Sequence, residues 1–135
     1  MEIAALCDVR IASDDAVFSM PEVALGMIPT AGGTQNLPRV MDRGSAFEMM
    51  LSGRSLSAHE ALRAGLVSAV VPTARLQAEA ERVARLVASL APEAVAAAKR
   101  AMMDGVDLTA EESLDLEERL AARLMGDDRG PQASG

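Results

Sequence analysis

The stretch from Met20 to Gln35 restricts the possible folds of this chain more than any other part of the sequence. It places a single acid, Glu22, among apolar residues and follows it with Gly26, Pro29 and the glycine pair at 32–33. This order predicts a carboxylate in apolar surroundings, beside a sharp loop that leads into the tight start of a helix. Apolar surroundings disfavour the charged form of a carboxylate. Glu22 is therefore a candidate for proton transfer near neutral pH.

The composition predicts an aliphatic core and argues against a nucleic-acid partner. Of the 135 residues, 50% are hydrophobic and only 1% are aromatic, so Ala, Val, Leu and the nine Met must fill the core. Nucleic-acid binding normally needs basic patches and aromatic rings for base stacking, whereas this chain has a net charge of −7 and no Trp or Tyr. The length fits one domain or a piece of a larger one.

The sequence predicts a soluble, cytoplasmic chain without a metal. Its single cysteine, Cys7, excludes an internal disulfide and suits a reducing compartment. No apolar run approaches the roughly 20 residues of a membrane span, and residues 1–4 lack the positive charges of a signal peptide. We interpret Cys7 as a small core residue. One Cys and one His, His59, do not make a zinc site.

Hydrophobic patterning predicts short strands in the first half of the chain and longer helices after them. The expected strands are 8–12, 16–20 and 66–71. The expected helices are 1–7, 34–41, 45–51, 57–65, 73–90, one that begins at Pro92, and 109–125. Ser57 and Thr109 each open a capping box, whereas Pro38 is awkward inside its helix unless it lies in the first turn or the helix bends there. Residues 127–135 are expected to be frayed.

Several motifs agree, in order and spacing, with one known family. They are Glu2-Ile3-Ala4-Ala5-Leu6-Cys7-Asp8, the strand 16–20, Pro21-Glu22-Val23, Leu25-Gly26-Met27-Ile28-Pro29, Ala31-Gly32-Gly33-Thr34-Gln35, Leu51-Ser52-Gly53, Ser57-Ala58, Ala61 and Ala64-Gly65-Leu66-Val67. From Glu2 to about Asp128 the chain resembles the crotonase superfamily, which comprises the enoyl-CoA hydratases and isomerases. The resemblance implies an α/β fold of the ClpP/crotonase type, truncated to a few short strands of the core sheet and a helical C-terminal region.

The resemblance covers only the C-terminal half of a crotonase domain. It implies that the repeated β-β-α turns of the N-terminal half are absent, together with much of the CoA site and both donors of the oxyanion hole, and we expect a chain truncated at both ends. It also implies three regions. Residues 1–72 are the C-terminal half of the core with the catalytic loop, 73–128 are a helical oligomerisation region, and 129–135 are a disordered tail.

Hydration of an α,β-unsaturated thioester needs a water that is deprotonated as it attacks Cβ and a proton that is delivered to Cα. Two carboxylates on either side of one water suit this task. The resemblance assigns proton donation at Cα to Glu22 and activation of the water to Glu2. The family's isomerases usually work with only the acid at the Glu22 position, so two acids favour a hydratase. The implied substrate is an acyl-CoA thioester, with no separate cofactor.

The residues around Glu22 are expected to bind the substrate and the water. They are Pro21, Val23, Leu25, Gly26, Pro29 and Thr30. At the position of Thr30 many hydratases have a glycine whose backbone N–H holds the catalytic water. A backbone donor survives the change to Thr, whereas the Thr side chain can narrow the pocket.

Simpler interpretations stand beside these. Glu2 can be a solvated acid near a helix start, Glu22 can be an ordinary loop acid, and His59 is expected to be an exposed helix residue. We interpret the methionines as core or pocket filling; they are Met20, Met27, Met41, Met49, Met50, Met102, Met103 and Met125.

The helices after Pro72 also have two interpretations. They either cover the chain's own sheet, or mediate assembly of a homo-trimer, with hexamers built from two trimers. The sequence thus predicts an enoyl-CoA hydratase-like lyase. The alternatives are an enoyl-CoA double-bond isomerase and a truncated, inactive fragment for oligomerisation or interaction.

Overall fold

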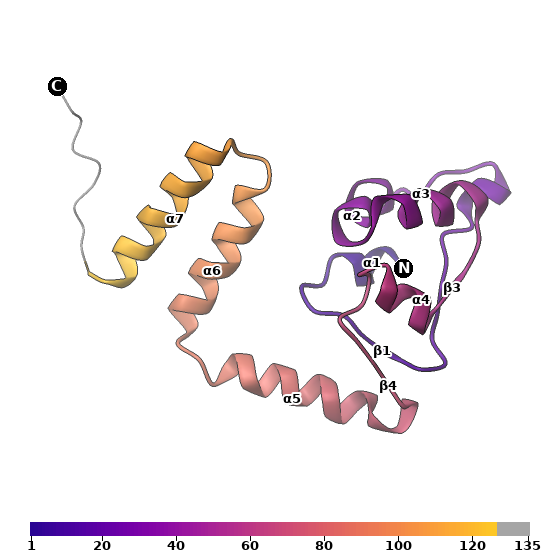
Figure 1. The fold of residues 1–135 in the computed structure, drawn as a ribbon, viewed down its shortest axis with the longest axis horizontal. Coiled ribbons are helices and arrows are strands. Elements are labelled where there is room, and N and C mark those ends of the chain that lie inside the picture. Colours follow the sequence, from indigo (N-terminus) through magenta and orange to yellow (C-terminus); the bar gives the residue numbers. More distant parts are fainter. Residues whose placement is uncertain (127–135) are drawn as a thin grey trace. The chain divides into compact units, whose positions relative to one another are not determined.

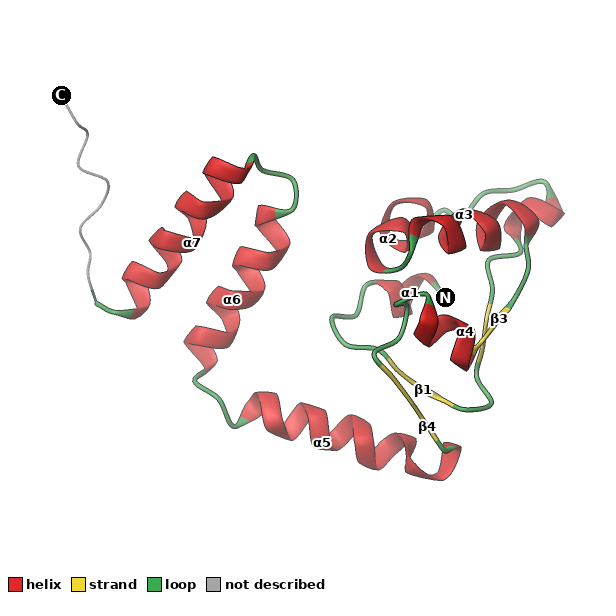
Figure 2. Cartoon of the chain, viewed as in Figure 1, coloured by secondary structure: helices red, strands yellow, loops and turns green. Residues whose placement is uncertain are grey.

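The computed structural model describes residues 1–126, and the chain divides into two compact units. The N-terminal unit runs from Met1 to Arg82, and the C-terminal unit begins at Val83. Within the described residues, every strand belongs to the N-terminal unit (Figure 2), whereas the C-terminal unit is helical. The strand-containing and the helical parts of the sequence are therefore separate compact bodies.

The N-terminal unit is built from short elements. Its helices are α1 (Glu2–Ala5), η1 (Glu22–Leu25), α2 (Gly33–Val40), α3 (Arg43–Ser52), α4 (Ala58–Arg63) and η2 (Thr73–Arg75), of which η1 and η2 are 3₁₀ turns. Its strands are β1 (Ile11–Ser13), β2 (Val17–Phe18), β3 (Leu56–Ser57) and β4 (Ala69–Val71). β1 pairs in parallel with β4 (Figure 1), and β2 pairs antiparallel with β3. These are two small two-stranded sheets.

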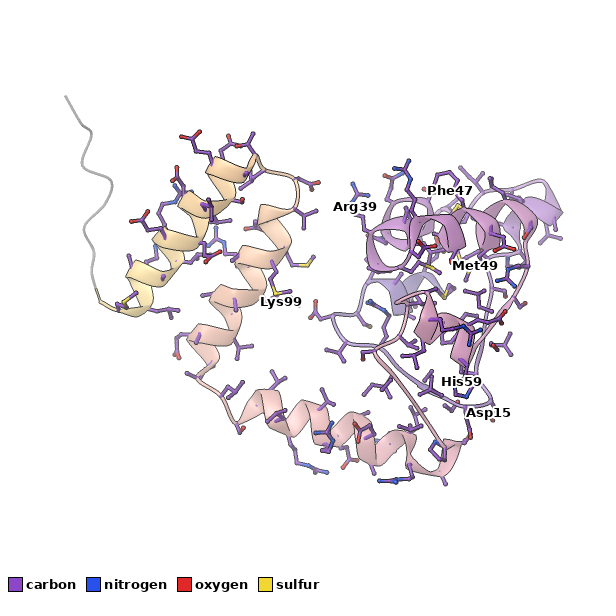
Figure 3. All side chains as sticks on the ribbon, viewed as in Figure 1. Asp15, Arg39, Phe47, Met49, His59 and Lys99 are labelled. Carbon is purple, nitrogen blue, oxygen red and sulfur yellow. The ribbon has the colours of Figure 1, made fainter. Side chains whose placement is uncertain are left out.

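The core of the N-terminal unit is aliphatic, as the composition predicted. Its largest fully buried side chains are Met20, Leu37, Met49, Leu56 and Leu66. Burying one such side chain contributes about 1.5–3 kcal/mol. Met49 and Phe47 both lie on α3 (Figure 3), but Met49 is in this core, whereas Phe47 is half exposed. The guanidinium of Arg43 lies over the Phe47 ring.

Side-chain caps explain where two of these helices begin. The Asp42 carboxylate accepts a hydrogen bond from the backbone N–H of Ser45 and so starts α3. Ser57 and Glu60 form the predicted capping box of α4. By contrast, α2 has no acceptor side chain at its N-cap, Gly32, whose φ is 90°. Its first N–H groups must find acceptors elsewhere.

The C-terminal unit contains the end of α5 (Leu76–Ala88), all of α6 (Pro92–Gly105) and all of α7 (Ala110–Leu124). The predicted capping box of Thr109 and Glu112 starts α7. α6 and α7 pack against each other. Of the described residues from Val83 onward, only Leu120 is buried. The exposed large apolar side chains of this unit are Leu86, Val87, Leu90, Met102, Met103, Val106, Leu108, Leu114, Leu124 and Met125.

The strands are shorter than the pattern predicted, and β3 was not predicted. Segments 8–12, 16–20 and 66–71 contain strand only where a partner pairs with them, in β1, β2 and β4. The residues before β1 lie in a loop, because Arg10 donates side-chain hydrogen bonds to the backbone carbonyls of Cys7 and Leu66. The helix expected over 73–90 is divided into η2 and α5.

The expectation that Cys7 is a core residue was wrong. α1 ends at Ala5, so Cys7 lies beyond the helix on the surface, with its thiol against the carbonyl of Ile3. Among the methionines, Met20, Met41 and Met49 are buried as predicted. The expected core role was wrong for Met102, Met103 and Met125, which are exposed because no described residue of their unit covers them. The exposed position expected for His59 is confirmed.

Two predictions concern the ends and the membrane. The frayed tail expected over 127–135, which includes the region assigned to 129–135, lies outside the described residues. Within residues 1–126, none of the helices combines the length and the apolar character that a bilayer crossing needs.

Candidate functional site

Glu22 begins the 3₁₀ turn η1, two residues after the buried Met20. The turn ends at Gly26, where φ is +70°, a left-handed conformation that glycine adopts without a steric penalty. There the backbone N–H of Gly26 donates to the carbonyl of Val23, and that of Met27 donates to the carbonyl of Glu22. The chain therefore reverses and leads 27–30 back past the Glu22 side chain.

Glu2 approaches the same loop from α1, which packs against α2. Its Oε1 accepts one hydrogen bond from the backbone N–H of Ala31 at 2.8 Å and one from that of Gly33 at 3.0 Å. Glu2 is half-buried, so the interpretation as a merely solvated acid is wrong. Its carboxylate links two segments that are far apart in the sequence.

Gly33 is needed for this close approach. A Cβ at this position would lie 2.5 Å from Met20 Cε, 2.8 Å from Pro29 Cβ and 3.0 Å from Glu2 Oε1. Real Cβ atoms essentially never lie within 3.0 Å of another heavy atom, and the Pro29 ring is rigid. The glycine pair thus allows Met20, Pro29 and the Glu2 carboxylate to meet at the start of α2.

The two carboxylates share one hollow of about 550 Å³. Its lining residues are Glu2, Glu22, Gly26, Met27, Ile28, Pro29 and Thr30. Of the predicted substrate- and water-binding residues, Gly26, Pro29 and Thr30 line it, whereas Pro21, Val23 and Leu25 do not. Within η1 the side chain of Leu25 points outward and is 69% exposed.

Sequence reasoning expected Met27 to fill core or pocket but did not name it among the substrate-binding residues, and it missed Ile28. Both line the hollow, although each is more than half exposed to solvent. The available signal was their position between Gly26 and Pro29, two residues that were predicted to line the site. Periodicity could not identify them, because the segment is neither helix nor strand.

The two acids differ in how their oxygens are satisfied. Glu22 Oε2 is buried and has no hydrogen-bond partner within residues 1–126. Buried polar atoms in folded proteins nearly always have a partner, so this oxygen marks a place for a water or a ligand group. Glu2 already gives one oxygen to two backbone donors. The hollow therefore offers one uncommitted carboxylate and one that is partly committed.

The described residues do not provide the ligands of a metal site. Within residues 1–126, no three His, Cys, Asp or Glu side chains are grouped so that they could hold a metal ion. Proton transfer by the two carboxylates is the chemistry that this hollow supports.

The family model described as enoyl-CoA hydratase/isomerase matches residues 1–133. The chain belongs to the enoyl-CoA hydratase/isomerase family. It is 44% identical over 125 residues to a protein from Dictyostelium discoideum named probable enoyl-CoA hydratase, mitochondrial, covering 93% of this chain and 45% of that protein. It is 41% identical over 116 residues to the short-chain-enoyl-CoA hydratase of Clostridium acetobutylicum, covering 86% of this chain and 44% of that protein.

The chain is also similar to solved structures of proteins named as members of this family. The crystal structure of enoyl-CoA hydratase from Bacillus anthracis matches with a TM-score of 0.88 and 38% identity, covering 92% of this chain and 48% of that one. The chain thus spans about half the length of the hydratase/isomerase relatives that it matches. The described residues form part of a crotonase-type α/β fold, and the predicted family and fold class are confirmed.

Proposed function

We propose that this chain supplies the two-carboxylate half of an enoyl-CoA hydratase site, which adds water in syn fashion to a 2-enoyl-CoA thioester. The observation that carries the proposal is the shared hollow, where Glu2 and Glu22 meet from distant parts of the sequence. Membership of the enoyl-CoA hydratase/isomerase family supports the substrate class. The thioester itself brings the coenzyme A, so no further cofactor is proposed.

The unequal environments of the two acids support distinct roles. Glu22, whose Oε2 is buried and has no partner among the described residues, is the proposed donor of the proton to Cα. Glu2 is the proposed activator of the water, through the oxygen that the loop does not use. The backbone N–H of Thr30 forms no hydrogen bond to another described residue and is the proposed water holder.

The enolate oxygen also needs N–H donors, and each is worth roughly 3–4 kcal/mol of barrier when lost. We propose that these donors lie in the half of the domain that the relatives have in addition to the part matched here. The chain alone is then expected to be inactive or very slow, and turnover is expected once that half is supplied.

The test follows the loss of enoyl-thioester absorbance with crotonyl-CoA. We expect turnover when the chain is joined to the upstream half of a relative's domain, and at least about a hundredfold loss in Glu22→Gln. Glu117→Gln, on α7 in the C-terminal unit, is the matched control and is expected to keep full activity. Unchanged activity in Glu22→Gln would remove this residue from the mechanism.

Double-bond isomerisation is the second candidate, because one oxygen of Glu2 is already committed to Ala31 and Gly33. If Glu2 serves only the loop, Glu22 is the single acid available for chemistry. Comparing 2-enoyl-CoA hydration with 3-enoyl-CoA isomerisation in Glu2→Gln separates the two. A hydratase loses hydration, whereas an isomerase keeps most of its rate.

We also propose that residues 73–128 mediate assembly into a homo-trimer, or a hexamer of two trimers. The exposed apolar side chains of α6 and α7 support an interaction surface there, since Leu120 is the only buried side chain among the described residues of their unit. Light scattering with size-exclusion chromatography tests this. A monomer at all concentrations would contradict it, whereas an assembly without turnover, even after the other half is supplied, would favour the inactive interaction fragment. The cytoplasmic location stays a prediction.

A further inference from the structure

We propose that Glu2 is also a positioning residue, which caps the loop 28–33 from a distance and thereby holds Thr30 at the wall of the hollow. The inference deepens the proposed function and rests on it for the identity of the ligand. Its geometric part concerns only this chain and can be tested without turnover.

The Glu2 carboxylate supplies an N-terminal cap that residues near the start of α2 do not provide. The first N–H groups of an α-helix have no partner within the helix, and at α2 no side chain near the N-cap accepts from them. Glu2, which lies on α1, supplies the missing acceptor. Its Oε1 accepts a hydrogen bond from the backbone N–H of Gly33, the first residue of α2, and another from that of Ala31, two residues earlier. One carboxylate oxygen therefore fixes the loop at two successive points.

The fit around this oxygen is close. Gly33 leaves the space that the Glu2 carboxylate occupies, because a Cβ there would lie 3.0 Å from Oε1. Gly32 supplies the left-handed turn, with φ of 90°, that places the two N–H groups on the same acceptor. The acceptor, the turn and the missing Cβ together define the shape of the loop.

Thr30 is the residue that this cap presents to the ligand. It directly precedes Ala31, it lines the hollow, and its hydroxyl has no hydrogen-bond partner within residues 1–126. Because the Glu2–Ala31 bond fixes the next peptide unit, loss of the acceptor is expected to release the Thr30 hydroxyl and N–H as well. Glu2 thus acts on the ligand in two ways, by its second oxygen and through Thr30.

The first experiment measures amide hydrogen exchange at Ala31 and Gly33 in the ¹⁵N-labelled full chain. Glu2→Ala is expected to speed exchange at these two amides about tenfold or more, whereas Glu2→Gln keeps their protection because its amide oxygen still accepts. Glu117→Gln is the control and leaves both amides unchanged. Equal exchange in the wild type and Glu2→Ala would overturn the cap; if Glu2→Ala does not fold, wild-type Ala31 and Gly33 amides that exchange as fast as those of an unstructured chain would do so.

The second experiment measures binding of butyryl-CoA, a saturated thioester that cannot be hydrated, by titration calorimetry in a double-mutant cycle, with the chain joined to the upstream half of a relative's domain. Thr30→Val, which keeps the shape and removes the hydroxyl, is expected to weaken binding about five- to tenfold in the wild type. In Glu2→Ala the same change is expected to have little effect, because residues that act through one another are not additive. Fully additive losses, or a completed wild-type domain that does not bind the thioester, would overturn the role of Thr30.

The catalytic role and the positioning role of Glu2 can be disproved independently of each other. In one outcome, Glu2→Ala speeds amide exchange at Ala31 and Gly33 while Glu2→Gln hydrates the substrate normally in the completed domain. In that case the hydration role of Glu2 is wrong and its positioning role stands. If Glu2→Gln abolishes hydration while Glu2→Ala leaves both amides protected, the catalytic role stands and the positioning role is wrong.

Discussion

Both units of this chain expose large apolar side chains, but among the described residues only the N-terminal unit also has a buried core of several side chains. The N-terminal unit packs Met20, Leu37 and Leu66 into a core without exposing them, whereas the C-terminal unit leaves Met102 and Leu114 largely in solvent. α2 in the N-terminal unit and α7 in the C-terminal unit both carry their apolar residues on one face. The comparison teaches that an apolar pattern identifies the face of a helix that can be buried, but not what will bury it.

Local hydrogen-bonding devices, by contrast, are the same in both units. The capping box of Ser57 and Glu60 starts α4, and that of Thr109 and Glu112 starts α7, with the same reciprocal bonds. A cap needs only residues within one turn, so it forms with or without a core. Substitutions can therefore separate what is local from what depends on packing.

The largest effect is expected for a core truncation in the N-terminal unit. Leu66 is fully buried, and Leu66→Ala is expected to lower the free energy of unfolding by about 2–5 kcal/mol, through lost burial and the cavity that remains. Urea denaturation of the wild type and the variant measures this change. A loss below about 1 kcal/mol would mean that the N-terminal unit does not have the rigid core described above.

The second prediction compares two glycines. Gly33→Ala is expected to destabilise the N-terminal unit by about 1–3 kcal/mol, because its Cβ meets Met20 and Pro29 at less than 3 Å. In Gly105→Ala, on α6, the added Cβ lies 3.5 Å from Ser113 Cβ, an ordinary van der Waals contact. This change is expected to stabilise its helix by about 0.5–1 kcal/mol. Thermal melts of both variants test the pair. Equal effects of the same sign would contradict the packing at Gly33.

The third prediction uses the matched caps. Ser57→Ala and Thr109→Ala are each expected to cost about 1 kcal/mol of helix stability. The first should lower the cooperative unfolding transition, since α4 contributes Ala58 and Ala61 to the core. The second should appear mainly as faster amide exchange in the first turn of α7. A reversed pattern would place the cooperative core in the other unit.

The fourth prediction concerns the stability of the N-terminal unit at low pH. The backbone N–H of Ser57, with further bonds from the Ser57 hydroxyl and Arg54, lowers the pKa of Glu60 from 4.5 to about 2. A lowered carboxyl pKa contributes stability above the unfolded value, and this contribution is lost as the pH falls from about 4.5 towards 2. Glu60→Gln should flatten this part of the stability curve. Circular dichroism melts across that range measure it, and identical curves for both proteins would contradict the capping role.

The smallest effect is expected for a truncation in the C-terminal unit. Leu114 is 66% exposed on α7, so Leu114→Ala should change the stability of the isolated chain by less than about 0.5 kcal/mol. If the proposed assembly covers this side chain, the same change should weaken association, as measured by sedimentation at several concentrations. A large loss of stability in the monomer would show that Leu114 is already packed.

The sequence by itself determined the family, the helical second half and both capping boxes. These depend on ordered motifs and on residues within one or two turns of each other. The pattern also singled out Glu22, Gly26, Pro29 and Thr30, which line one hollow in the structure. Strand limits were less predictable, because a strand exists only where a partner pairs with it, as β4 does with β1.

Only the tertiary structure decided which partners these residues meet. It gave Glu2 two backbone donors beyond residue 30 and brought Met27 and Ile28 into the hollow. It left one oxygen of Glu22 without a partner in the part of the chain that the structure describes. It also placed Cys7 on the surface and left the methionines of α6 exposed. Local patterns record what a side chain can do with its neighbours along the chain. Burial and long-range hydrogen bonds depend on which distant segment arrives beside it.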